Sequence, residues 1–203
     1  MKHRSTPIIS RSTGSRHLPI SSIRRSVRPG FVGLSAVSCR RYRHDVTDRR
    51  KILYVDLDNT LVHFKSGIDR LGAADFHEYQ DRYDEAPGIF ALMDPIDGAI
   101  EAFTLLAEHF DAYILSTAPW KNPSAWSDKL LWVQKHFGIE PTSVAYKRLI
   151  LSHHKNLNHG DFLVDDRDHN GAKDFTGELI KFGSAEFPDW DAVTAHLLAS
   201  ARN

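Results

Sequence analysis

Five short apolar segments separated by longer helical segments constrain the fold of this chain more than any other feature. These segments are residues 51–56, 112–116, 148–151, 161–165 and 178–182. The first reads KILYVD and is mostly apolar, as is typical of a strand buried on both faces. The alternation predicts an α/β fold with a doubly wound, Rossmann-like parallel sheet. Ligands of such sheets bind at the carboxyl ends of the strands.

Three helices are expected between and after these strands. Asp97 is a candidate N-cap for a helix over 98–110. A second helix begins at Ser124 and ends at Gly138, and one apolar face should point to the core: Trp126, Leu130, Val133 and Phe137. A third opens at Pro188 and Asp189, with these side chains inward: Trp190, Val193 and Leu197.

The first 44 residues differ from the rest in charge. They hold ten Lys or Arg and no Asp or Glu, whereas residues 45–203 hold 16 basic and 26 acidic residues. We expect a disordered basic tail over 1–44, because it lacks the apolar pattern needed to bury surface, and one domain over 45–203. The tail is interpreted as an appendage or misassigned start, as a transit segment, or as a segment that binds an anionic partner.

Cysteine content, charge and hydropathy limit the compartment and the partners. The only cysteine, Cys39, excludes an intrachain disulfide and favours a reducing compartment. We therefore expect a cytoplasmic protein, or a mitochondrial or plastid one if the tail is a transit segment. The acidic body argues against a nucleic-acid partner. The weakly polar run 31–39 is too short to cross a bilayer, so no membrane partner is expected.

Two carboxylates at the end of the first strand form the strongest chemical motif. Asp56 and Asp58 are two residues apart, so on an extended chain they face the same way. One carboxylate can attack phosphorus and form an acyl phosphate. The other can protonate the leaving oxygen and then activate water. The alternative interpretation is a pair of solvated carboxylates at a strand end.

A second acidic pair, Asp165 and Asp166, ends the fourth strand. In a parallel sheet this brings up to four carboxylates to one edge. Two like charges 4 Å apart at intermediate dielectric repel by about 4 kcal/mol, so a cation is expected among them. An oxygen-only ligand set beside a phosphate suits Mg²⁺. The alternative is an acidic loop neutralised by Arg167.

Hydroxyls and a lysine complete the candidate site. Ser116 and Thr117 close the second strand and can donate to phosphate oxygens, and Lys155 can supply a positive charge. Each of these signals is weak alone, and their order along the chain gives them weight. Neighbouring histidines, His153, His154 and His159, lack the spacing of a zinc site and are interpreted as loop residues.

The order of these motifs over residues 51–200 resembles that of the haloacid dehalogenase superfamily. The similarity is closer to the 5′(3′)-deoxyribonucleotidase family, also called cytosolic 5′-nucleotidase type C. The shared features are the run from Asp56 to Phe64, Pro95-x-x-Gly98-Ala99, Thr117-Ala118-Pro119, Trp132-Val133 before Phe137-Gly138, and Lys155 ten residues before Asp165-Asp166-Arg167. Receiver domains place their acid pair after the first strand, so the order seen here excludes them.

The resemblance implies a role for each matched residue. Asp56 would be the nucleophile and a metal ligand, and Asp58 the acid/base, with its backbone carbonyl on the metal. Asp166 would be the third protein ligand of Mg²⁺, with Asp165 in support. Lys155 would bind phosphate. The resemblance does not decide which hydroxyl binds phosphate. Aligning Pro119 with the family's proline favours Thr117, whereas counting from the start of the strand favours Ser116.

The resemblance also implies a substrate. We expect a Mg²⁺-dependent phosphomonoesterase acting on (deoxy)nucleoside monophosphates, with another small phosphate ester, such as a sugar phosphate, as the alternative. Phe64 and Trp120 are the candidates for contact with the base. A small helical cap is expected at about 65–95. It is short and does not match the family's base-binding cap.

Overall fold

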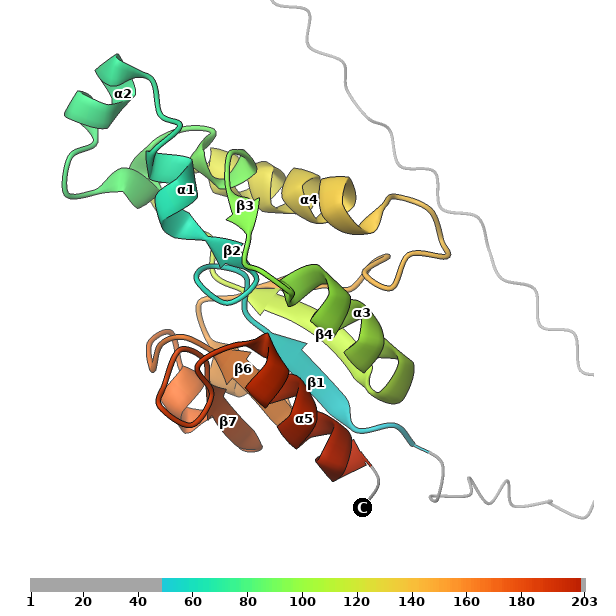
Figure 1. Cartoon of the computed structure of the whole chain (residues 1–203). Coiled ribbons are helices and arrows are strands. Elements are labelled where there is room, and N and C mark those ends of the chain that lie inside the picture. Colours follow the sequence, from blue (N-terminus) through green and yellow to red (C-terminus); the bar gives the residue numbers. More distant parts are fainter. Residues whose placement is uncertain (1–48, 202–203) are drawn as a thin grey trace, which may run out of the picture. The chain divides into compact units, whose positions relative to one another are not determined.

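A computed structural model describes residues 49–201, so the expectations for the basic tail lie outside the described residues. Five parallel strands form one sheet in the order β5-β4-β1-β6-β7. They are β1 (Ile52–Val55), β4 (Asp111–Ser116), β5 (Leu149–Leu151), β6 (Phe162–Asp165) and β7 (Glu178–Lys181). The predicted parallel α/β sheet is confirmed, with β1 at its centre (Figure 1).

Successive side chains of β1 point to opposite faces of the sheet, as expected for an extended strand. Leu53 and Val55 belong to the main core, whereas Tyr54 belongs to a smaller cluster with Phe175. The smaller cluster lies near two one-turn helices, η4 (Lys155–Leu157) and η5 (Ala172–Asp174). Apolar burial on both faces explains why the β1 sequence has no polar alternation.

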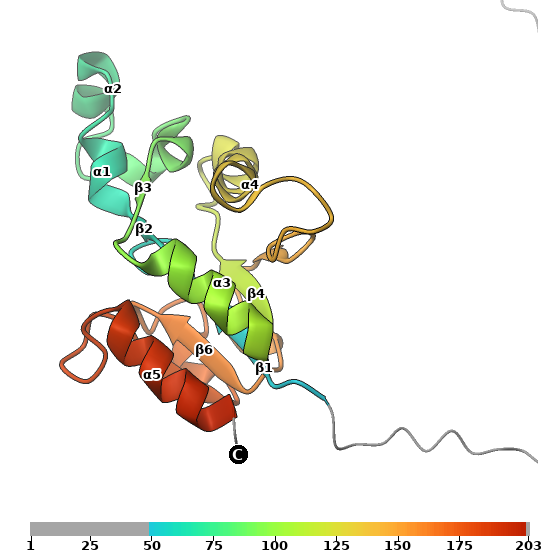
Figure 2. The ribbon, with the colours of Figure 1, turned by 45° about the vertical axis from the view of Figure 1, so that its right-hand side comes forward.

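Helices α3 (Ala99–His109) and α5 (Trp190–Ala201) lie side by side on the main-core face (Figures 1 and 2). The inward positions predicted for the last helix are confirmed, because Trp190, Val193 and Leu197 are buried. The predicted cap of α3 is wrong. Gly98, at φ +76°, occupies the N-cap position and no side chain caps the helix. Asp97 stands one residue before the N-cap. A side chain bonds the first free N–H groups of a helix from the N-cap itself, so Asp97 is one residue too early.

Helix α4 (Ser124–Phe137) has the predicted ends, with Gly138 after its last turn. Its predicted inward face is partly wrong. Val133 is buried, but Trp126 and Leu130 are each 45% exposed. The helix instead buries Lys129 and Trp132, and the Trp132 indole N–H donates to the Met93 carbonyl at 2.8 Å. A buried polar contact, absent from the apolar pattern, therefore sets the rotation of the helix.

The segment between β1 and α3 contains only short elements. They are β2 (Val62–His63), α1 (Phe64–Ile68), α2 (Ala73–Glu78), η2 (Tyr83–Glu85), η3 (Ile89–Ala91) and β3 (Asp94–Pro95). Strands β2 and β3 pair antiparallel and form the stem of this insertion. Figure 1 shows α2 at the end of the insertion away from the sheet. Between residues 49 and 201, no helix is both long and apolar enough to cross a membrane.

Candidate active site

A tight loop directly after β1 positions the first two carboxylates. Asp56 extends the ladder, because its N–H donates to the Val164 carbonyl at 2.8 Å. Asn59 then adopts a left-handed backbone, φ +53°, which asparagine tolerates better than most residues. The Leu57 carbonyl accepts from the N–H groups of Leu61 and Val62, each at 2.9 Å. The motif therefore folds into a compact turn at the carboxyl end of the central strand.

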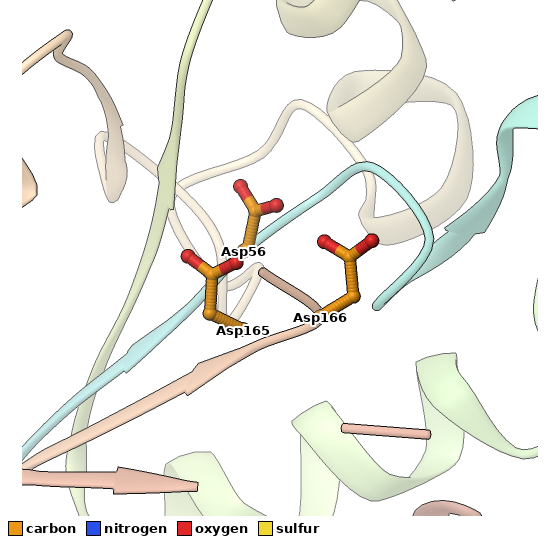
Figure 3. A group of neighbouring side chains, drawn as sticks. All are labelled: Asp56, Asp165 and Asp166. Atoms are coloured by element: carbon orange, nitrogen blue, oxygen red, sulfur yellow. The ribbon is translucent and has the colours of Figure 1, made fainter. Parts of the chain in front are cut away.

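Asp56, Asp165 and Asp166 converge at this edge of the sheet. Each offers one carboxylate oxygen, and these three oxygens lie within 4.8 Å of one another. Figure 3 shows the Asp165 and Asp166 side chains rising from the end of β6 toward the same side as Asp56. The structure thus brings together three of the acids that the sequence singles out.

Lys155 lies between two of these acids. Its ammonium is buried, is 2.9 Å from Asp56 Oδ1 and also contacts Asp165 Oδ2. The Lys155 N–H donates to the Asn170 carbonyl at 2.7 Å, which fixes the start of η4 beneath the site. Burial alone would lower the pKa of Lys155, but the Asp56 and Asp165 carboxylates outweigh it and raise that pKa. Lys155 therefore stays charged beside the candidate nucleophile.

Burial changes the acidity of the carboxylates around this lysine. It raises the pKa of Asp165 to about 6, and the negative charge of Asp56 adds to the effect. Burial also raises the pKa of Asp166 and, most relevant to proton transfer, that of Asp58. Lys129 opposes the rise at Asp58, whereas Asp56 adds to it. A carboxyl with a raised pKa is suited to act as a general acid near neutral pH.

The sequence does not distinguish Ser116 from Thr117 as the phosphate-binding hydroxyl, and the structure places these two hydroxyls in different environments. Thr117 lines the inner pocket with Asp56, Asp58 and Lys155, and its hydroxyl donates to the Ser152 carbonyl at 2.8 Å. Ser116 is fully buried, and its hydroxyl lies 3.1 Å from Lys129 Nζ. Thr117, rather than Ser116, is thus placed to meet a phosphate bound beside Asp56.

A larger cavity of about 780 Å³ opens outward from the inner pocket. Both candidates for base contact line it: Phe64, whose ring is tilted against that of Phe90 with 5.8 Å between ring centres, and Trp120, which is 85% exposed. The inserted segment supplies a run of polar residues to the wall. Those residues are Asp81, Arg82, Tyr83, Asp84 and Glu85. The cavity therefore has room for a group much larger than phosphate.

Sequence reasoning missed two parts of this site. Lys129, from the middle of α4, contacts Asp58 in the interior. The segment 81–85 reaches the outer cavity from the insertion. A signal for Lys129 existed, since it lies three residues before Trp132 and four before Val133 on the buried face. A lysine in that position is more often a solvated residue whose stem covers apolar surface.

The acidic trio fits a divalent cation. All three side chains offer oxygen, and Asp166 Oδ1 is buried without a hydrogen-bond donor among the described residues. Its charged neighbour is Arg167, whose Nε lies 3.5 Å away. Hard cations prefer such oxygen ligands. Asp56 and Asp166 would hold the ion from just beyond the ends of two neighbouring strands.

This α/β fold, with carboxylates at the ends of β1 and β6 and a lysine between them, defines the haloacid dehalogenase class of proteins. Residues 75–191 match the protein family described as 5′ nucleotidase, deoxy (pyrimidine), cytosolic type C protein. The chain belongs to this family.

Similarity to individual proteins agrees with the family. The chain is 57% identical over 148 residues to a "Putative 5′(3′)-deoxyribonucleotidase" of Vibrio phage KVP40, which covers 73% of this chain and 85% of the phage protein. It is 43% identical over 83 residues to a protein of the same description from Bordetella bronchiseptica, covering 40% of this chain and 42% of that protein. The human "5′(3′)-deoxyribonucleotidase, cytosolic type" is 32% identical over 111 residues, covering 54% of this chain and 48% of the human protein.

Proposed function

We propose that this protein is a Mg²⁺-dependent phosphomonoesterase that hydrolyses (deoxy)nucleoside monophosphates through a phosphorylated Asp56. The observation that carries the proposal is the convergence of Asp56, Asp165 and Asp166 around the buried Lys155, beneath a cavity large enough for a nucleoside. The names of the relatives support the same substrate class.

In the first half-reaction, an Asp56 carboxylate oxygen attacks phosphorus and the bond from phosphorus to the ester oxygen breaks. Asp58 gives its proton to that leaving oxygen, which departs as the nucleoside hydroxyl. Lys155 and Thr117 are proposed to bind the phosphoryl oxygens. Bound Mg²⁺, held by Asp56, Asp166 and the Asp58 backbone carbonyl, would stabilise the negative charge on the phosphoryl group.

In the second half-reaction, Asp58 is ionised and acts as the base. It takes a proton from water, the water oxygen attacks phosphorus, and the bond to Asp56 breaks. Inorganic phosphate leaves, and both carboxyls return to their starting states. One residue can serve in both steps because the leaving oxygen and the attacking water occupy the same side of phosphorus.

The test is phosphate release from nucleoside monophosphates and sugar phosphates, with Mg²⁺ and with excess chelator. Nucleotides should be preferred, chelator should remove activity, and added Mg²⁺ should restore it. Asp56→Asn should abolish turnover, and acid quenching should trap labelled phosphate on the wild type but not on Asp56→Asn. Preference for a sugar phosphate would establish the alternative substrate class, and full activity in Asp56→Asn would exclude the mechanism.

A further inference from the structure

A second buried lysine, Lys129, lies beneath the site and has no part in phosphate binding as proposed above. Its side chain is completely buried. Its Nζ lies 2.5 Å from Asp58 Oδ2, 3.1 Å from Ser116 Oγ and 4.4 Å from the centre of the Phe90 ring. These contacts come from the loop after β1, from β4 and from the inserted segment.

This arrangement is costly unless each contact is well made. A buried ammonium loses its hydration, and a lysine side chain loses much rotamer freedom when it is fixed. A lysine needed only for packing could be replaced by an apolar residue of similar volume, often without loss of stability. The placement of this charge on Asp58 therefore suggests a role in the reaction.

The two oxygens of Asp58 have different surroundings. Oδ2 accepts from Lys129, whereas Oδ1 is buried without a hydrogen-bond partner among residues 49–201. Asp58 also lines both the inner pocket and the outer cavity. Fixing Oδ2 leaves Oδ1 as the oxygen that can exchange a proton with the substrate or with water.

We propose that Lys129 is a positioning residue that holds Asp58 by Oδ2, so that Oδ1 is placed to transfer the proton in both half-reactions. This inference rests on the proposed function, in which Asp58 is the acid and base. A misplaced acid should matter most when the leaving oxygen needs a proton. An alkyl ester such as a nucleotide needs one, whereas 4-nitrophenyl phosphate releases a stable phenolate and does not.

The experiment compares kcat/KM for a nucleoside monophosphate and for 4-nitrophenyl phosphate, since this constant reports the steps up to departure of the leaving group. Lys129→Met should lose roughly tenfold or more on the nucleotide, within the range of roughly 10²–10⁴ that acid–base catalysis contributes, and much less on the aryl ester. Lys135→Met is the matched control, because Lys135 is exposed on the same helix. Equal losses of Lys129→Met on both substrates would overturn the inference.

A second comparison keeps the inference testable if Lys129→Met does not fold. Asp58→Asn/Lys129→Met removes both charges together, and it should match Asp58→Asn alone on the nucleotide because Lys129 acts through Asp58. A further tenfold loss in the double variant would show an independent role and overturn the inference. Failure of the proposed function looks different: Asp58→Asn itself would then keep wild-type turnover.

Discussion

At the residue scale, positive and negative side chains are closely interleaved in the site, and each cationic side chain contacts different carboxyl groups. Lys155 contacts Asp56 and Asp165, Lys129 contacts Asp58, and Arg167 lies beside Asp166. Four carboxyl groups thus face three cations, and a bound divalent ion would add positive charge where a phosphate binds. The arrangement explains how acids so close together persist in a folded protein.

Phe64 and Trp120 should decide how well a base binds. Both line the outer cavity, and stacking of a base on an aromatic ring is worth about 1–3 kcal/mol. Phe64→Ala and Trp120→Ala should therefore raise KM for a nucleotide by roughly fivefold to 150-fold, as that energy implies, and leave a minimal phosphate ester unaffected. Steady-state kinetics on both substrates is the measurement. Parallel losses on both, with a lower Tm, would indicate a structural role instead.

His136 should make the fold sensitive to acid. It stacks on Trp132 with 4.3 Å between ring centres, and its Nε2 is buried without a hydrogen-bond partner among the described residues. Burial, helped by the charge of Lys135, lowers the pKa of His136. The folded state then binds fewer protons than the unfolded state below about pH 6.5, so stability falls as pH falls through that value.

The measurement is Tm between about pH 7.5 and about pH 5.5, a window that spans the ordinary pKa of histidine. His136→Gln should lose less Tm over that window than the wild type. His109→Gln, at the exposed end of α3, is the control and should follow the wild type. An unchanged acid dependence in His136→Gln would place the sensitivity elsewhere.

The chemical motifs could be read from the sequence because they concentrate unusual residues at strand ends. Asp56, Asp165, Asp166 and Lys155 meet as predicted, since parallel strands bring their carboxyl ends to one edge. Lys129 could not be assigned in this way. Its partner, Asp58, is 71 residues away, and only the rotation of α4 brings the two together.

At the scale of elements, α4 joins the inserted segment to the catalytic loop. Asn122, buried just before the helix, donates to the carbonyls of Asp84 and Ala86, each at 2.9 Å. The side-chain amide oxygen of Asn122 accepts from the Ser124 hydroxyl at 2.8 Å. That hydroxyl in turn accepts from the Gly88 N–H at 2.9 Å. One turn further along the helix, Lys129 reaches Asp58.

Asn122→Ala should therefore loosen the wall of the outer cavity. The buried Ala86 carbonyl left without its donor costs roughly 1–3 kcal/mol, so the free energy of unfolding should fall by at least that amount. Urea denaturation measures the change. Gln80→Ala, at an exposed position of the insertion, should leave stability within about 0.5 kcal/mol of the wild type. A neutral result at Asn122 would mean that the insertion is held by other contacts.

Apolar spacing predicted the existence of the elements better than their orientation. The strands and the ends of α4 follow from runs of apolar residues and from Gly138. The same pattern put Trp126 and Leu130 in the core, where the structure exposes them. The reason is that hydrogen bonding by Trp132 and ion pairing by Lys129 orient the helix, and neither contributes to hydrophobic periodicity.

At the scale of the whole molecule, the described domain contains its own core. Its buried apolar residues run from Leu53 to Leu197. A shortened protein that begins at Val46 should therefore have the Tm and the kcat/KM of the full chain. Thermal melting and nucleotide turnover on the two proteins measure this. A clear drop in Tm for the shortened protein would show that the basic tail contributes to the fold.

The central place of β1 has a consequence for how the chain acquires its structure during synthesis. Ile52 pairs with Asp111 and Leu53 with Phe162, so both neighbours of this strand are made long after it. Pairing between such distant segments slows folding, and unpaired apolar strands tend to aggregate while they wait. The segment around Asp56 leaves the ribosome before either neighbouring strand and reaches its working geometry only after β6 has been made. A chaperone that shields it until β6 emerges should therefore raise the yield of active protein.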